Sequence, residues 1–283
     1  MKYITLNNNL KMPMLGYGTY QIENLEKCEH SVLDALNNGY RLIDTAASYM
    51  NEEAVGNAIK KSGIKRSDIF LTSKVWIQDH GYESTIAAFE RSLEKLQTDY
   101  LDLYLIHQAY GDIYGTWRAM EDLYKAGKTR AIGVCNFNQR QILDLSAFNE
   151  IKPMINQIEH NPFFQNEIMY QTLQDEDIQM EAWGPFAEGH NDIFNNSTLK
   201  TIADKYNKTT GQVILRWTIQ KGIITIPKSV REERIKENFD IWDFELSVED
   251  MNVIQTLDEG KSSIIDFDNP EIIKFLSSMK IHD

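Results

Sequence analysis

The first half of the chain carries four side chains with complementary acid–base chemistry: Asp44, Tyr49, Lys74 and His107. A phenol has a reference pKa of about 10, so Tyr49 could give its proton to an oxygen that becomes negative. A nearby lysine ammonium would stabilise the phenolate and lower that pKa, and a carboxylate beyond the lysine would keep it charged. An imidazole could hydrogen-bond the same oxygen. None of the four groups supplies electrons, so we expect hydride from a cofactor.

Each of these residues also has a simpler interpretation when it is taken alone. Asp44 and Lys74 could form a structural salt bridge, and His107 could be a hydrogen-bonded core residue. Tyr49 is one of 13 tyrosines. Burying all four groups together costs desolvation energy, and such a costly cluster is typical of a site that moves a proton. The chemical interpretation therefore requires a fold that brings the four together.

Short apolar runs alternate with segments of helical period along most of the chain. Trp117, Met120 and Leu123 mark one such helical segment, which Gly127 ends. Because no Pro-rich or Gly/Ser-rich linker interrupts the alternation, it favours an α/β fold, a (β/α)8 TIM barrel. An open doubly wound sheet is the alternative. The eight strand-like runs are 41–44, 69–75, 101–106, 131–135, 154–158, 178–183, 223–226 and 239–242.

The two ends of the chain do not follow this alternation. An Asn triplet at 7–9, flanked by short apolar runs, indicates that residues 1–20 form an N-terminal β-hairpin that closes the bottom of the barrel. Residues 259–283 are an irregular C-terminal tail with a brief apolar stretch, which we expect to fold back over the barrel. Residues 1–283 are predicted to form a single domain.

In such a barrel, the carboxyl ends of the strands open on one mouth, so polar residues that end a strand are candidate site residues. Tyr49 lies in the loop after the first run and overhangs the same mouth. The predicted fold therefore gathers the four acid–base groups in one place. The residues that end the runs, or follow them closely, are Asp44, Lys74, His107, Gln108, Asn136, Gln157, Glu159, Trp183, Lys228 and Ser229.

The segment after the seventh run, IPKSVREERIKEN, concentrates positive charge at a predicted helix start. Ser229 and Glu232 have the spacing of a capping box, and free backbone N–H groups there favour an anion. With Lys228, Arg231 and Arg234 they predict a phosphate pocket where barrels often have one. A solvated helix face of ion pairs is the alternative. No Gly-x-Gly-x-x-Gly opens a helix after a strand, which disfavours a Rossmann domain.

Composition excludes several classes of partner. The 283 residues include 29 Lys and Arg against 42 Asp and Glu, and the net charge of −13 repels nucleic acid and anionic membranes. Cys28 and Cys135 cannot build a disulfide framework, and the first residues have no apolar signal core, so a cytoplasmic location is expected. A barrel buries its core without a partner, so we expect a monomer.

Seven motifs occur in order along nearly the whole chain: GYRLIDTAASYMNEEAVG, LTSKVW, LDLYLIH, GVCNF, INQIEHNP, EAWGPFAEG and IPKSVREERIKEN. At these spacings the chain resembles the aldo-keto reductase family. The resemblance implies a barrel that uses NADPH for the reversible reduction of a small carbonyl substrate. It further implies that Tyr49 is the proton donor, supported by Lys74 and Asp44. In the same way His107 would orient the carbonyl.

The resemblance also implies a cofactor site, with NADPH as the cofactor and no metal. Two amides would bind the nicotinamide carboxamide and an aromatic ring would stack on the nicotinamide. A bidentate Arg at the 2′-phosphate favours NADPH over NADH. The matching positions are Asn136 and Gln157 for the carboxamide, Trp183 for the ring, Gly184 and Phe186 for the pyrophosphate, Lys228, Ser229 and Arg234 for the 2′-phosphate, and Glu237 and Asn238 near the adenine.

Departures from the family pattern concern mainly the substrate pocket. Tyr20 stands where many members have Trp, and Gln108 precedes Ala where Pro is frequent, so the wall that they form with Trp76 is altered. Cys135 replaces the usual Ser beside the amide-binding Asn. Trp183 followed by Gly is similar to bacterial diketogluconate and glyoxal reductases, which favours small bacterial metabolites as substrates.

Two other functions would use the same residues. A regulatory subunit could bind NADPH on this scaffold with little turnover. A metal-dependent barrel hydrolase could use Asp44, His107 and His160, but the Lys74 ammonium would oppose a metal ion. We therefore predict an NADPH-dependent reductase of small aldehydes, ketones or dicarbonyls.

Overall fold

Eight parallel strands form the centre of the protein, in a computed structural model that describes residues 1–283. The first and last strands meet where Gly16 N donates to Thr225 O at 2.9 Å and Gly18 N donates to Pro227 O at 3.1 Å. The expected (β/α)8 barrel is confirmed. In sheet order the strands are β3 (Tyr17–Gly18), β4 (Leu42–Asp44), β5 (Phe70–Val75), β6 (Leu103–Ile106), β7 (Ile132–Cys135), β8 (Ile155–Glu159), β9 (Gln179–Trp183) and β10 (Ile224–Thr225).

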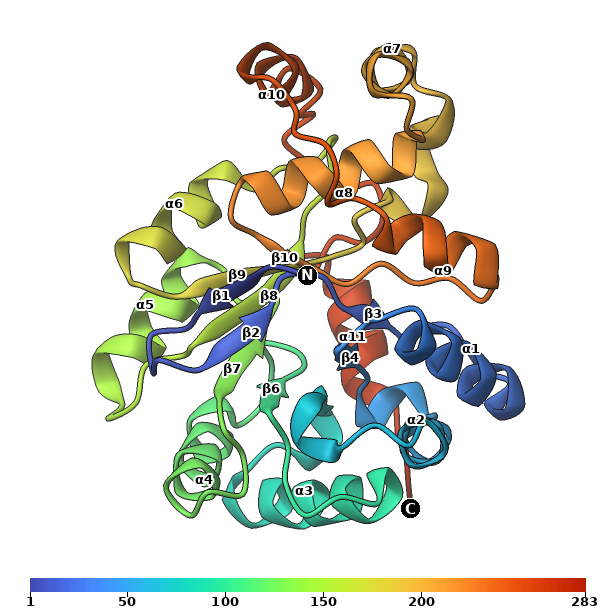
Figure 1. The fold of residues 1–283 in the computed structure, drawn as a ribbon. Coiled ribbons are helices and arrows are strands. Elements are labelled where there is room, and N and C mark those ends of the chain that lie inside the picture. Colours follow the sequence, from blue (N-terminus) through green and yellow to red (C-terminus); the bar gives the residue numbers. More distant parts are fainter.

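Helices surround the strands (Figure 1). Each barrel strand is followed by one helix of the repeat; these helices are α1 to α6, α8 and α9. Three further helices, α7, α10 and α11, do not belong to the repeat. None of them has the length and apolar character that a bilayer span requires. Their bounds are α1 (Leu25–Asn37), α2 (Glu52–Lys61), α3 (Tyr82–Leu96), α4 (Ile113–Lys125), α5 (Gln139–Phe148), α6 (Glu167–Asp175), α7 (Ser197–Tyr206), α8 (Thr210–Gln220), α9 (Glu232–Phe239), α10 (Val248–Gln255) and α11 (Pro270–Ser278).

Two apolar clusters hold these elements together. The main cluster contains 56 buried residues drawn from the barrel strands and the helices around them. A second cluster of 11 buried residues, among them Trp217, joins α7, α8 and α10. Because interiors are close-packed, the carboxyl ends of the strands present their side chains from a fixed backbone.

A hairpin covers the amino ends of the strands. It consists of β1 (Tyr3–Thr5) and β2 (Lys11–Pro13), which pair in antiparallel fashion as expected. In its turn, Asn7 Nδ2 donates to Pro153 O at 3.1 Å and to Asp177 O at 3.0 Å. These carbonyls lie just before β8 and β9, so the hairpin closes the end of the barrel away from the predicted site.

The predicted strand at 239–242 is wrong. Phe239 is the last residue of α9, and the centre of its ring lies 4.9 Å from that of Tyr40. The eighth barrel strand is β3, inside the segment 1–20 that the sequence assigns to the hairpin alone. Two residues are too few to show a strand period. Their partners, β4 and the residues around Thr225, are also distant in sequence.

The C-terminal tail covers the carboxyl ends of the strands, and its helix α11 is drawn in red in Figure 1. Trp76 Nε1 donates to Met279 O at 2.9 Å. At the end of the chain, His282 Nε2 lies 3.0 Å from Asp79 Oδ1. The tail is therefore fixed to the loop after β5, above the mouth where the predicted site residues gather.

Candidate active site

Lys74 is fully buried on β5 and connects two of the other predicted groups. Its ammonium donates to Asp44 Oδ1 at 2.5 Å, to Thr45 O at 2.9 Å and to the Tyr49 hydroxyl at 3.3 Å. Burial lowers the pKa of Lys74, but the Asp44 charge opposes this and the net pKa lies above its ordinary value. The lysine is therefore a cation fixed between a carboxylate and a phenol.

Tyr49 lies in a short 3-10 turn, Ala47–Tyr49, that follows β4. The centre of its ring is 5.0 Å from that of Tyr20 and 5.4 Å from that of His107. Burial raises the pKa of Tyr49 and Lys74 lowers it, and the net pKa lies above the ordinary value. The expected lowering by Lys74 is thus present but smaller than the effect of burial. Tyr49 keeps its proton at neutral pH, as a proton donor must.

His107 follows β6 and faces the same space. The centre of its ring is 5.4 Å from that of Tyr49 and 5.2 Å from that of Trp76, and its Nδ1 is 3.1 Å from Ser48 Oγ. Burial and the Lys74 charge hold the pKa of His107 well below its usual range. The imidazole is therefore neutral at pH 7, and it offers a hydrogen bond rather than a charge.

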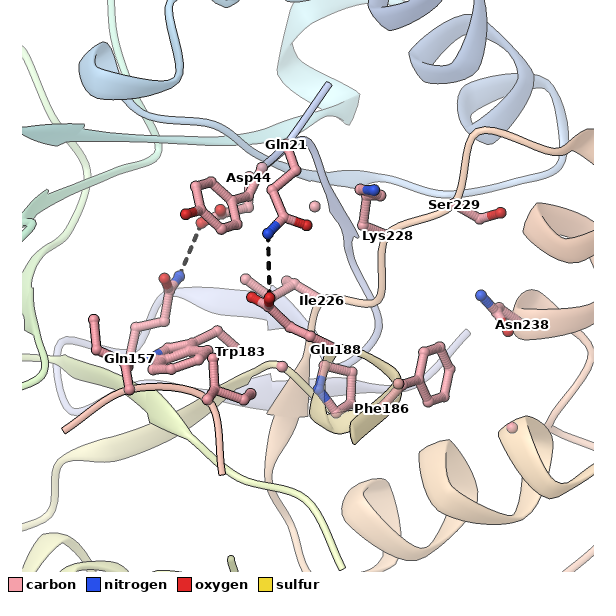
Figure 2. A pocket seen from close by; sticks show the side chains of 18 of the residues that line it. Gln21, Asp44, Gln157, Trp183, Phe186, Glu188, Ile226, Lys228, Ser229 and Asn238 are labelled. Carbon is pink, nitrogen blue, oxygen red and sulfur yellow. Dashed lines mark hydrogen bonds between the residues drawn. The ribbon is translucent and has the colours of Figure 1, made fainter. Parts of the chain in front are cut away.

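Gln157 connects Asp44 to a second buried carboxyl group, Glu181, which the sequence analysis did not identify. Gln157 Nε2 donates to Asp44 Oδ2 at 2.8 Å (Figure 2) and to Glu181 Oε2 at 2.9 Å. The Cys135 thiol donates to Gln157 Oε1 at 3.8 Å. Burial and the Asp44 charge raise the pKa of Glu181 to about 8, so it is mostly protonated at pH 7. One Glu within the apolar run QMEAW is the only sequence signal for it.

A cavity of about 1050 Å³ extends from Tyr49 to the start of α9. Figure 2 shows Asp44, Gln157 and Trp183 toward one side of it, and Ser229 and Asn238 toward the other. Lys74, Glu159 and Arg231 do not line this cavity, whereas the other residues predicted for the reductase site do. These residues are Tyr20, Asp44, Tyr49, Trp76, His107, Gln108, Asn136, Gln157, Trp183, Gly184, Phe186, Lys228, Ser229, Arg234, Glu237 and Asn238.

Asn136 and Trp183 form one wall of the cavity beside the acid–base groups. Trp183 Nε1 donates to Asn136 Oδ1 at 2.9 Å, and Asn136 Nδ2 donates to Gln108 Oε1 at 3.3 Å. An indole ring and an amide thus lie next to each other on the cavity surface. A flat ring that carries a carboxamide would fit both groups, since the ring could stack on the indole and the carboxamide could bond the amide.

The opposite end of the cavity is basic and has few partners within the chain. Lys228 and Arg234 are exposed and form no ion pair with the glutamates of α9, so the alternative of an ion-paired helix face is not supported. The predicted capping box of Ser229 with Glu232 is wrong, because Ser229 Oγ accepts from Arg231 N at 3.2 Å and α9 has no side-chain cap. Uncapped N–H groups beside two cations suit a phosphate group.

Two further parts of the cavity wall escaped the sequence analysis. Gln21 Nε2 donates to Glu188 Oε2 at 3.2 Å and links two loops across the cavity (Figure 2). Neither loop has a periodic pattern that would indicate this contact. The tail supplies an apolar part of the cavity wall, in which Met279 contacts Trp76, Ile264 lies beside Gly184 and Phe267 lies beside Trp183. Its residues are Ile264, Ile265, Phe267, Phe275, Leu276 and Met279.

His160 does not join the other groups, contrary to the hydrolase alternative. Its ring stacks on Trp217, with ring centres 4.7 Å apart and planes 7° apart, and its Nδ1 is 2.8 Å from Gln165 O. It does not line the cavity that contains Asp44 and His107. The three proposed ligands therefore do not converge on one point.

The sequence profile of the Aldo/keto reductase family matches residues 14–259. The chain belongs to this family. This aldo/keto reductase is 52% identical over 259 residues to the glyoxal reductase of Bacillus subtilis (strain 168), a match that covers 91% of this chain and 93% of that protein. It is 41% identical over 261 residues to the methylglyoxal reductase DkgA of Escherichia coli (strain K12), covering 91% and 94%.

Solved structures also match this aldo/keto reductase. The crystal structure of a Bombyx mori aldo-keto reductase in complex with NADP superposes with a TM-score of 0.88 at 34% sequence identity, covering 94% of this chain and 95% of that one. The family resemblance that the motifs indicate is thus confirmed by sequence and by fold.

Proposed function

We propose that this protein is an NADPH-dependent reductase of small aldehydes, ketones and dicarbonyls, with Tyr49 as the proton donor. One observation carries this proposal: the Lys74 ammonium contacts both the Asp44 carboxylate and the Tyr49 hydroxyl, beside a neutral His107. The similarity to proteins named glyoxal reductase and methylglyoxal reductase favours 1,2-dicarbonyls within this class.

NADPH would occupy the cavity from Trp183 to Arg234 and supply the hydride. In this proposal the Trp183 ring stacks on the nicotinamide, and Asn136 and Gln157 bind its carboxamide. Gly184 and Phe186 lie along the pyrophosphate. Lys228, Ser229 and Arg234 bind the 2′-phosphate, with Glu237 and Asn238 beside the adenine; all of these residues line the one cavity.

The acid–base groups would then act on the substrate oxygen. The carbonyl oxygen accepts hydrogen bonds from the Tyr49 hydroxyl and from His107, which polarise the C=O bond. As the carbon takes up hydride, the oxygen takes the Tyr49 proton and an alcohol forms. Lys74, which Asp44 keeps charged, stabilises the phenolate until it is protonated again.

We further propose a single domain over residues 1–283 that works as a monomer in the cytoplasm and binds neither nucleic acid nor membranes. The substrate would lie between Tyr49 and the wall formed by Tyr20, Trp76, Gln108 and the tail. That wall is largely aromatic and aliphatic, which suits a compact carbonyl compound.

The test is NADPH oxidation with methylglyoxal as substrate, measured for the wild type and for Tyr49→Phe. Loss of the proton donor should lower kcat at least about 10²-fold, because general acid catalysis typically contributes that much. Tyr114→Phe, at an exposed tyrosine of α4, is the matched control and should keep wild-type turnover. Unchanged turnover in Tyr49→Phe would refute the role of Tyr49. Tight NADPH binding without turnover of any aldehyde would favour the regulatory subunit.

A further inference from the structure

His107 has one ring proton, and its position decides what the ring can do. Burial and Lys74 keep the imidazole neutral, so only one of its two nitrogens carries hydrogen. If Nε2 carries it, the ring can donate to a carbonyl oxygen in the cavity. If Nδ1 carries it, a lone pair faces that oxygen and opposes the growing negative charge. A reductase of carbonyls therefore requires one particular tautomer.

The hydrogen-bond partner of Nδ1 differs between His107 and two other histidines, the buried His160 and the half-buried His80. The Nδ1 atoms of His80 and His160 face the carbonyl oxygens of Tyr110 and Gln165, which only accept, so these nitrogens carry the proton. The Nδ1 of His107 instead faces the Ser48 hydroxyl at 3.1 Å. A hydroxyl can donate, so it permits an unprotonated Nδ1.

Ser48 has no other acceptor within the chain. Its contact with His107 is the single hydrogen bond that its side chain makes, so the hydroxyl proton is satisfied when Oγ donates to Nδ1. No second group in the chain bonds the His107 ring, which leaves Nε2 available to a ligand in the cavity. Ser48 also shares the short turn Ala47–Tyr49 with Tyr49, so one backbone segment carries both side chains.

We propose that Ser48 is a positioning residue, which donates to His107 Nδ1 and thereby fixes the Nε2–H tautomer that binds the substrate oxygen. This inference rests on the proposed carbonyl reduction, since the tautomer matters for activity only if an oxygen accepts from His107. It adds Ser48 to the site; this residue lies within the first motif but is not among the predicted site residues.

The direct test is the tautomer itself, from two-bond ¹⁵N–¹H correlation spectra of protein labelled with ¹⁵N-histidine, with His107→Ala used to assign the signals. We expect Nε2–H in the wild type and in Ser48→Thr, which keeps a hydroxyl. In Ser48→Ala we expect a mixture of tautomers or Nδ1–H. An unchanged Nε2–H tautomer in Ser48→Ala would overturn the proposal. This experiment needs no turnover, so it separates the role of Ser48 from the proposed function.

The kinetic test uses the same variants with NADPH and methylglyoxal. Ser48→Ala should lower kcat/KM about 2- to 10-fold, the range expected for one hydrogen bond, with an unchanged Kd for NADPH, and Ser48→Thr should restore it. In a His107→Ala background, Ser48→Ala should have no further effect, because its action passes through the imidazole. An equal loss in both backgrounds would show a merely structural role and overturn the proposal.

Discussion

The two ends of the cavity are built on different principles. We call the end that contains Asp44, Tyr49 and His107 the reaction end, after the proposed function. There, Lys74 is fully buried and its ammonium is satisfied by Asp44, Thr45 and Tyr49. At the other end, called the phosphate end after the proposed function, Lys228 and Arg234 are exposed and have no carboxylate partner. At the reaction end, where the proposed chemistry takes place, the chain itself pairs every charge of the Lys74 network. At the other end, the charges of Lys228 and Arg234 remain for a ligand to neutralise. Substitutions at the two ends should consequently affect different quantities.

The strongest test of this difference is a matched pair of lysine substitutions. Lys74→Met leaves the Asp44 carboxylate buried without its cation, and we expect the free energy of unfolding to fall by about 3–5 kcal/mol. Lys228→Met, at an exposed side chain, should change it by less than about 0.5 kcal/mol. Urea denaturation of both variants measures the effect. Equal losses of stability would contradict the contrast between the two ends.

At the phosphate end the expected effect is on cofactor selectivity. Arg234→Ala removes a cation that would bind the 2′-phosphate, and a hydrogen bond to a charged group contributes about 1.5–3 kcal/mol. The Kd for NADPH should therefore rise about 10- to 100-fold, while the Kd for NADH, which lacks this phosphate, stays within about twofold. Titration of protein fluorescence with each nucleotide measures both constants. A similar rise for both would place Arg234 elsewhere along the cofactor.

The protonated Glu181 gives the reaction end a pH dependence of stability. Its pKa is raised to about 8 in the folded protein, whereas an unfolded Glu titrates near 4.3, so between these values the folded state binds one more proton. The contribution of Glu181 to the free energy of unfolding should then fall as pH rises across this window, by about 1.4 kcal/mol per pH unit, and be constant above it.

Glu181→Gln should remove this contribution, and Glu249→Gln, at an exposed glutamate of α10, should retain it. Urea denaturation at pH 5, 6, 7 and 8 compares the slopes. The same slope in wild type and Glu181→Gln would mean that Glu181 is ionised in the folded protein, and that the reaction end contains two buried negative charges.

The sequence predicts that Asp44, Lys74 and His107 converge, because barrel geometry determines their positions. Asp44 and Lys74 belong to neighbouring strands and His107 directly follows the next strand, and parallel strands bring their carboxyl ends together whatever the loops do. The strand β3 is missed because its two residues show no periodicity, and Phe239 resembles a strand residue only by its hydrophobicity. Local patterns do not report pairing between distant segments.

The other residues that the sequence does not indicate depend on contacts between distant parts of the chain. Met279 accepts a hydrogen bond from Trp76, which is 203 positions away in the sequence, and no motif or period predicts such a contact. In the sequence, Glu181 is one polar residue within an apolar strand, and only the fold shows that it accepts a hydrogen bond from Gln157. A role for Ser48 can be inferred only from the fold, which places its Oγ 3.1 Å from His107 Nδ1.

The attachment of the chain's last residues bears on how the protein should be produced. Ile281 N donates to Gln78 Oε1 at 2.8 Å, and His282 contacts Asp79 at 3.0 Å, so a peptide fused after Asp283 would emerge beside the loop after β5, close to the cavity residue Trp76. Met1 precedes a hairpin at the other end of the barrel and is partly exposed. An affinity tag for purification should therefore disturb the cavity less at the amino terminus than at the carboxyl terminus.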